Sequence, residues 1–304
     1  MIVRLVLTAS LLFISFNVEA TAQVTKIAEL QRLFISPTAT MLESATLNIS
    51  GGGIFGVDSR GSGRSHFRIG IGGVGELAFL QQEIFSNIFP SGATLGVTSL
   101  KIVIIPELKF GKLISSTFSG MVRSSNWTGK IISSDRGHLL ADADFSSVGL
   151  QSAGFETRFA SFYFIGTIKY KNATLHFGPI ITDFRYRNLS LSFLEIDSFF
   201  DDEERSRVRS GGFIGFTNMI NPSTMMIFDV TSIPRLHLNA RSPSISLRED
   251  ILAMWGLRYF MHEFISLDTA MRYYYSQTEL SDIQVKIGLN VNLPLRKIIK
   301  KAKS

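Results

Sequence analysis

The stretch SDIQVKIGLNVNLPL, residues 281–295, alternates apolar and polar side chains over most of its length. Its apolar positions are Ile283, Val285, Ile287, Leu289, Val291 and Leu293. A period of two predicts a β-strand, because successive side chains of a strand point to opposite faces of a sheet. Two environments produce this pattern: a soluble sheet with one face in water, and a membrane strand between lipid and a water-filled lumen.

Segments of the same kind recur along the chain from residue 45 onward. They cover residues 45–57, 66–72, 75–81, 98–105, 113–125, 155–170, 174–187, 212–220, 223–232, 251–260 and 264–276. With 281–295 they give about eleven to thirteen strands of roughly ten residues, the length that a tilted strand needs to cross a bilayer. Closed single-chain barrels favour even strand numbers. We therefore predict an all-β fold, a closed antiparallel transmembrane β-barrel of about twelve strands, with ten or fourteen as alternatives.

The last three segments indicate what the two faces of the barrel would carry. The predicted lipid-facing side chains carry no charge: Trp255, Leu257, Ile265, Leu267, Met271, Ile283, Val285, Ile287, Leu289 and Val291. The other face carries Arg258, Arg272 and Lys286, with Asp268, among small and polar residues. Tyrosines towards the strand ends, such as Tyr259, suit a membrane interface, where their rings meet lipid and their hydroxyls meet water.

A secreted soluble β-sandwich that binds a ligand is the alternative architecture. Its wet face would hold the same basic residues, but only 18% of the chain is charged, which is little for a surface in water. The mean hydropathy is positive, yet no apolar run after residue 22 approaches the roughly 18–20 residues of a membrane helix. High hydropathy without helical spans favours the barrel, which satisfies every backbone polar group within lipid.

The first 22 residues have the features of a secretory signal peptide. Arg4 precedes the apolar run LVLTASLLFISF, residues 5–16, and small residues lead to a predicted cleavage site after Ala22, with cleavage after Ala20 as the alternative. An uncleaved N-terminal anchor helix is the competing interpretation. We divide the chain into a signal peptide, 1–22; an N-terminal arm or short helix, 23–43; the barrel, 44–295; and a basic C-terminal tail, 296–304.

The sequence contains no signature of a catalytic or metal site. The absence of cysteine excludes cysteine-ligated zinc and iron–sulfur sites. The five histidines are scattered without a metal-binding spacing, and no G-x-S-x-G nucleophile motif is present. The acidic run within residues 193–212 lacks the spacing of a calcium loop and predicts a solvated loop. We expect no metal, no cofactor and no enzymatic activity, with a membrane lipid hydrolase as the competing hypothesis.

The signal peptide, the absent cysteines, the alternating strands and the glycine-rich segment ATLNISGGGIFGV, residues 45–57, resemble a Gram-negative outer-membrane β-barrel protein. The stretch LFISPTATMLESATLNISGGG, residues 33–53, also resembles the start of uncharacterised barrel families. The resemblance implies export to the outer membrane, contact with its lipid, a monomer, envelope proteins as partners and no nucleic acid. The chain departs from this pattern in its last strand, which ends in NLPL instead of a terminal aromatic residue.

Basic residues are the most informative group on the predicted lumen face. They are Arg68, Lys101, Arg123, Lys169, Arg185, Arg258, Arg272 and Lys286, with Asp268 as an acidic partner. Positive charges inside a pore favour anions, whereas an internal ion-pair network would fill a narrow barrel instead. The sequence thus predicts a passive outer-membrane pore, anion-preferring if the basic residues line open space, or a barrel that scaffolds envelope components.

Overall fold

A computed structural model describes residues 32–56, 59–83, 85–86, 94–111, 113–133, 150–193, 199–239, 244–275 and 283–295. The predicted signal peptide and basic tail lie outside these residues. Twelve long strands make up the barrel: β1 (Thr46–Gly56), β2 (Ser59–Ile71), β3 (Gly75–Glu83), β5 (Thr94–Phe110), β6 (Ile114–Ser125), β8 (Leu150–Tyr170), β9 (Ala173–Phe193), β11 (Arg205–Asn221), β12 (Thr224–Asn239), β13 (Ser244–His262), β14 (Ile265–Tyr274) and β15 (Gln284–Pro294). Three short strands lie beside the long ones. β4 (Phe85–Ser86) pairs with β12, β7 (Thr128–Ser133) with β8, and β10 (Phe199–Asp201) with β9.

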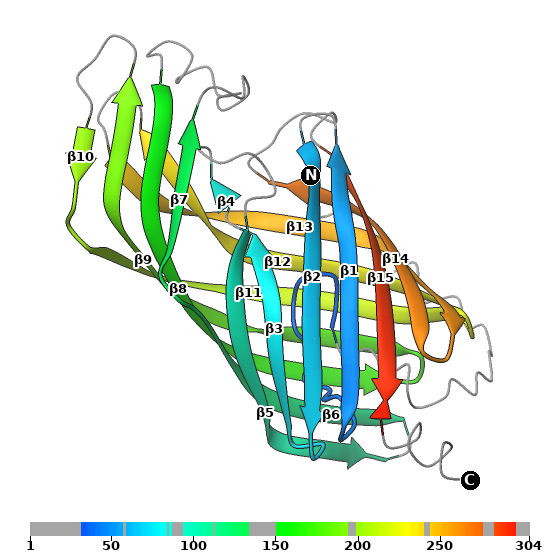
Figure 1. Cartoon of the computed structure of the whole chain (residues 1–304). Helices are drawn as coiled ribbons and strands as arrows, with labels where there is room; N and C mark the ends of the chain where they lie inside the picture. Colours follow the sequence, from blue (N-terminus) through cyan, green and yellow to red (C-terminus); the bar gives the residue numbers. More distant parts are fainter. Residues whose placement is uncertain are drawn as a thin grey trace.

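The sheet closes on itself between its first and last strands (Figure 1). β1 pairs antiparallel with β2 on one side and with β15 on the other, from Thr46 opposite Pro294 to Phe55 opposite Val285. Each neighbouring pair of long strands is antiparallel. Closure leaves no strand edge exposed along the wall, which is the condition for a sheet in hydrocarbon. The prediction of a closed twelve-strand antiparallel barrel is confirmed.

The two ends of the barrel differ in their connections. Short turns join β2 to β3, β5 to β6, β8 to β9, β11 to β12 and β13 to β14. The first of them contains Gly72 and Gly73 with φ of 63° and 75°, the left-handed conformation that a tight hairpin turn requires. The opposite end carries most of the longer connections. We name the first the short-turn end and the second the long-loop end. In outer-membrane barrels the short turns face the periplasm.

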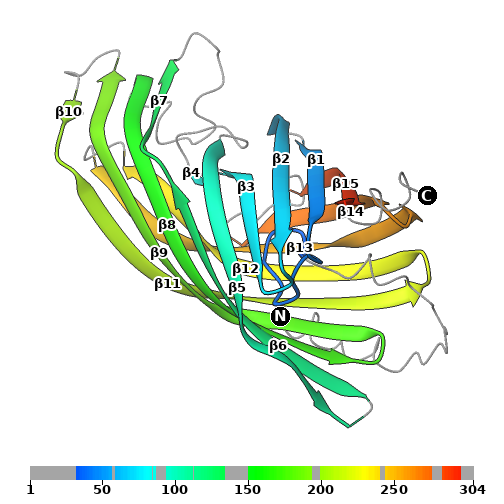
Figure 2. The same ribbon diagram turned by 60° about the horizontal axis from the view of Figure 1, so that its bottom comes forward.

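Several strands extend further than the sequence pattern predicts. β8 is one continuous strand of 21 residues, as is β9, and both rise above the rest of the wall in Figures 1 and 2. The prediction of a loop through residues 193–212 is therefore wrong at Phe199–Asp201, which forms β10, and from Arg205 onward, where β11 begins. β5 also continues beyond Pro106, because the register shifts between Ile105 and Leu108 and a proline is tolerated at such an irregularity.

The outward face of the wall is apolar and the inward face is buried. Trp255 is 48% exposed and Met271 is 45% exposed, while their neighbours Met254 and Arg272 on the same strands are buried. The predicted lipid-facing residues of β13, β14 and β15 all lie on this outward phase. None of the described residues forms a helix long and apolar enough to cross a membrane.

Residues 32–44 lie inside the barrel, where the strands enclose them as the dark-blue trace of Figures 1 and 2. A bridge between Arg32 and Pro37 folds the segment back on itself. The helical alternative for the N-terminal arm is wrong for this part, because its backbone bonds to the barrel wall instead of forming helical turns. We name residues 32–44 the interior segment.

Candidate functional site

The interior segment is packed as tightly as a protein core. Leu33, Phe34 and Leu42 are almost completely buried. Phe34 and Leu33 join a cluster with side chains of β12, β13 and β14. Two wall glycines make room for the segment, since a Cβ at Gly215 would collide with Leu33 Cδ1 and one at Gly70 with the carbonyl oxygen of Glu43. The segment therefore fits a groove shaped for it.

A single carboxylate holds the turn of the interior segment. Asp229 on β12 accepts hydrogen bonds from the backbone N–H of Ile35 (2.7 Å) and of Ser36 (3.0 Å), and from Ser36 Oγ (2.6 Å). Asp229 is buried, so its charge has lost water as a partner and depends on these three donors. This arrangement ties the segment to the wall at one defined point.

Basic side chains of the wall bind the carbonyl oxygens of the same segment. Lys286 Nζ donates to the carbonyl of Phe34 (2.8 Å), and Arg258 donates to that of Arg32 (3.3 Å). Lys101 Nζ donates to the carbonyls of Thr38 (3.2 Å) and Thr40 (2.8 Å). Three of these carbonyls belong to the buried residues Arg32, Phe34 and Thr38, and the cations satisfy them.

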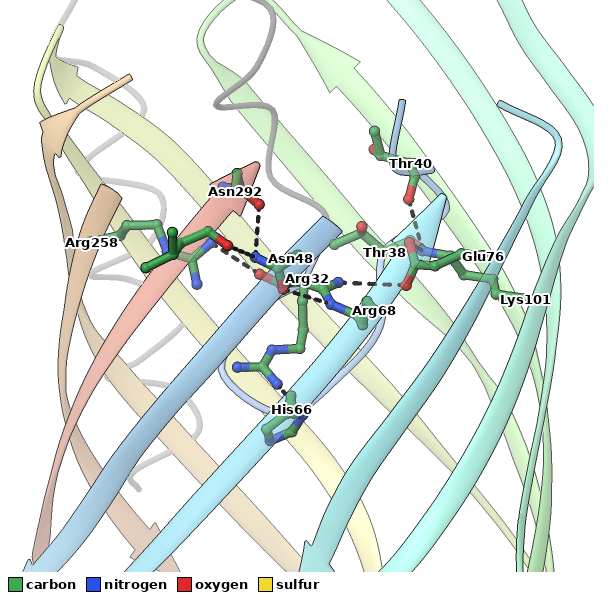
Figure 3. A network of polar contacts seen from close by, with 11 residues as sticks. Arg32, Thr38, Thr40, Asn48, His66, Arg68, Glu76, Lys101, Arg258 and Asn292 are labelled. Carbon is green, nitrogen blue, oxygen red and sulfur yellow. Dashed lines mark hydrogen bonds and ion pairs between the residues drawn. The ribbon is translucent and has the colours of Figure 1, made fainter. Parts of the chain in front are cut away.

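Two acidic side chains balance part of this positive charge. Glu76 lies 3.2 Å from Lys101 Nζ and 3.5 Å from Arg68. Asp268 takes a two-pronged contact from Arg258, at 2.6 and 2.8 Å. Figure 3 shows Glu76, Arg68 and Lys101 side by side, with Thr38 and Thr40 of the interior segment within reach. The cations are thus shared between wall carboxylates and segment carbonyls.

The buried charges within the barrel are predominantly positive. Among the described residues, seven basic side chains are buried: Arg32, Arg68, Lys101, Arg123, Arg258, Arg272 and Lys286. Four acidic side chains are buried: Glu76, Asp229, Asp250 and Asp268. The interior therefore carries a formal excess of three positive charges, from seven minus four. Aromatic rings also contact two of the buried arginines, since Arg123 and Arg272 each lie 4.7 Å from a tyrosine ring centroid.

The structure brings together most of the basic residues predicted for the lumen. Six lie buried on the inward face: Arg68, Lys101, Arg123, Arg258, Arg272 and Lys286. Lys169 lies on the inward phase of β8 near the short-turn end, beside a cavity. Arg185 is a correction, because it lies on the outward phase of β9 and pairs with Asp183 (2.9 Å) and Glu204 (3.2 Å). The predicted acidic partner Asp268 contacts Arg258.

Sequence reasoning missed the interior segment and the acids that hold it. Glu76 and Asp229 both lie on inward positions of predicted strands, so their phase could have identified them. Arg32 gave no such signal, because it belongs to a segment without strand periodicity. Among the described residues, no group of three or more histidine or acidic side chains is placed to hold a metal ion.

A cavity of about 360 Å³ lies at the short-turn end, beneath the interior segment. Its lining includes Thr40 and Met41 of that segment, Val74 of the first short turn, and Lys169 and His176 of the β8–β9 hairpin. A second void, near Arg32 and the glycines of β1, is only about 20 Å³ and could hold one water molecule. The larger space is the one with room for a solute.

Comparisons with known proteins add little beyond the fold. No protein-family model matches the chain, and no curated protein does. Among solved structures, the translocator domain of autotransporter NalP from Neisseria meningitidis is 9% identical over 82% of this chain and 86% of its own, with a TM-score of 0.41. The NanC porin is 9% identical over 81% and 98%, with a TM-score of 0.39. The CymD monoaromatic hydrocarbon channel is 9% identical over 83% and 89%, with a TM-score of 0.38. Likenesses this distant carry no conclusion about function.

Proposed function

We propose that the protein is an outer-membrane channel whose lumen is closed by its own interior segment and which admits small anionic solutes when that segment yields. The closed wall with an apolar outward face and a polar inward face supports a position in a membrane. The short turns on one end and longer connections on the other support an orientation with the interior segment entering from the periplasmic side.

The excess of buried basic side chains is the observation that carries the preference for anions. Charges in a confined, low-dielectric interior act more strongly than charges in water. When a solute passes Lys101 and Lys286, its negative groups replace the segment carbonyls as partners of these cations. Anions gain from this exchange and cations do not.

The way in which the segment is held supports its role as a movable closure. Its polar anchors are the hydrogen bonds that it donates to Asp229 and those that it accepts from Lys101, Lys286 and Arg258. Its apolar anchors are a few side chains such as Leu33. None of these contacts is covalent. An incoming anion competes with each cation–carbonyl bond, because both offer oxygen acceptors to the same donor.

Conductance across planar bilayers tests this proposal. We expect small or rare conductance steps from the folded wild type, and larger steps with chloride preferred over potassium when Asp229→Ala loosens the segment. Lys286→Gln and Lys101→Gln in that background should each lower the chloride preference, measured as a reversal potential in a salt gradient. Lys109→Gln is the matched control, because its side chain is 73% exposed near the β5–β6 hairpin, eight residues along β5 from Lys101.

Folded protein is verified by heat-modifiable gel migration before each recording. A silent bilayer for both the wild type and Asp229→Ala would refute the channel. A conducting but cation-preferring Asp229→Ala protein would refute the anion preference while leaving the channel in place.

A further inference from the structure

The chain that follows β3 pairs with the opposite wall of the barrel. β4 lies parallel to β12, with Phe85 beside Arg235 and Ser86 beside Leu236. Around the closed wall, β3 and β12 are six strands apart in either direction, so they face each other across the lumen. Figure 1 shows β4 near the upper end of β3, at the long-loop end. The pairing of β4 therefore links two opposite walls at the mouth of the barrel.

The link between these two walls is short. Only one residue separates Glu83, where β3 ends, from Phe85, so their Cα atoms are at most about 7.6 Å apart. Pairing of β4 with β12 adds about 4.8 Å, which makes a total of about 12 Å from β3 to β12. A circular barrel of twelve strands tilted by about 40° is about 24 Å across between backbones. The mouth is therefore narrowed to about half of that width where β4 binds, and we name this link the β4 strap.

The sequence of β12 leaves an edge free for β4. β13 pairs with β12 along its whole length, so β4 uses the other edge, which β11 occupies nearer the short-turn end. Among the described residues, the pairing of β11 with β12 ends at Phe213 opposite Thr231. At the next rung a side chain replaces the backbone acceptor, since the N–H of Gly212 donates to Ser232 Oγ (2.8 Å). Pro234 follows and has no N–H with which to continue the ladder. The contact with β11 thus ends immediately before the residues that pair with β4.

The alternation of backbone groups along β12 shows which of them face the β4 strap. The carbonyl of Ser223, directly before β12, accepts from the N–H of Phe260 on β13 (2.8 Å). Backbone groups of successive residues point to opposite sides of a strand, and the register of β12 with β13 has no shift. Odd-numbered residues therefore turn their backbone groups to β13, and even-numbered residues, such as Pro234 and Leu236, turn theirs to the other edge. Of these two, Leu236 is the residue that has an N–H to offer β4.

We propose that the β4 strap sets the size limit of the channel. It forms a constriction at the long-loop mouth that passes inorganic anions and solutes of monosaccharide size and excludes larger ones. It acts in series with the interior segment, which blocks the lumen until it yields. Pairing between backbones suits this role, because its hold does not depend on the charge of the solute. This inference rests on the proposed function, since a size limit requires a barrel that conducts.

A pair of engineered cysteines tests the strap itself, because the chain has no cysteine of its own. Ser86→Cys with Leu236→Cys places two thiols on neighbouring strands, whose separation of about 4.8 Å lies within the Cα range of a disulfide. Ser124→Cys with Ala160→Cys is the control pair, on β6 and β8 of the regular wall. We expect both pairs to cross-link to the same extent on mild oxidation of the folded protein. Cross-linking of the control pair alone would overturn the inference.

Liposome swelling with neutral sugars measures the size limit independently of charge. All proteins carry Asp229→Ala, which loosens the interior segment. Leu236→Pro removes the N–H that faces β4 and keeps the pairing with β13, as Pro234 does in the wild type. Leu236→Ala is the matched control, because it shortens the same side chain and keeps the N–H.

We expect the Leu236→Ala protein to admit arabinose and to exclude sucrose. Leu236→Pro should raise the swelling rate in sucrose relative to arabinose by about fivefold or more, because the mouth widens. Equal ratios in the two variants would overturn the size limit. If Leu236→Pro fails to fold, as judged by heat-modifiable gel migration, the cysteine pairs still decide. Cross-linking of the strap pair without permeation of any solute overturns only the channel, and permeation without that cross-link overturns only the strap.

Discussion

Replacing Asp229 by alanine tests how much this carboxylate contributes to the docking of the interior segment. The substitution removes the acceptor of three hydrogen bonds, from Ile35 N, Ser36 N and Ser36 Oγ, at a buried position. A hydrogen bond to a charged group contributes about 1.5–3 kcal/mol. The three bonds share one carboxylate and are not additive, so we expect the segment to lose about 3–5 kcal/mol of its docking free energy.

The isosteric substitution Asp229→Asn provides a graded comparison. Its amide oxygen can accept both backbone N–H groups, and its NH₂ can donate to Ser36 Oγ, so all three partners stay satisfied. Only the charge is lost, and we expect a cost of about 1 kcal/mol. Asp250→Ala is the position control, because this buried acid of the neighbouring strand β13 bonds to Arg235 and to the backbone of Ile251.

Hydrogen–deuterium exchange of the folded protein in detergent measures how often the interior segment undocks. A loss of about 3 kcal/mol raises the undocked fraction of the segment more than 100-fold, since about 1.4 kcal/mol corresponds to a factor of ten. Amides of residues 33–42 should exchange faster by that factor in Asp229→Ala, by about fivefold in Asp229→Asn, and unchanged in Asp250→Ala. Identical exchange in the wild type and Asp229→Ala would refute the view that this carboxylate anchors the segment.

Two further predictions follow from the packing. Gly215→Ala should displace Leu33 and destabilise the docked segment by about 1–3 kcal/mol, read as faster exchange of the same amides, whereas Gly96→Ala, whose Cβ meets open space, should have no effect. Leu257→Arg, on the outward face of β13, should destabilise the folded barrel in lipid by up to about 2–4 kcal/mol in a urea titration; an unchanged midpoint would place that face in water.

The barrel itself could be predicted from the sequence because lipid and lumen impose opposite polarity on alternate residues. The register of β1 with β15 repeats this alternation on both strands, so that Ile49 lies opposite Val291 on the outward face and Ser50 opposite Asn290 inside. The ends of the strands were harder to predict, since β8 and β9 extend beyond the rest of the wall and lose the polarity pattern there.

Arg185 illustrates that loss of pattern. On β9 the inward positions include the apolar Ile180 and Phe184, whereas outward Asp183 and Arg185 form an ion pair with each other. The assumption that charged residues face the lumen therefore gave the wrong inward phase for β9. The polarity rule holds where hydrocarbon touches the wall and fails where it does not.

The interior segment could not be predicted because its position depends on contacts between residues far apart in the sequence. Ile35 and Asp229 are separated by 194 residues, and Phe34 and Lys286 by 252. The segment has no strand or helix periodicity to mark it, and its polar backbone groups are satisfied by wall side chains. Such long-range polar complementarity leaves no local signature.

Fluorescence quenching of Trp255 by lipids brominated midway along their acyl chains tests the central claim most directly. The chain has two tryptophans, and Trp127→Phe leaves Trp255 of the outward face as the sole emitter. Contact between that face and hydrocarbon predicts strong quenching by the brominated lipid and little by aqueous iodide. Quenching by iodide without quenching by the brominated lipid would contradict a membrane-spanning barrel.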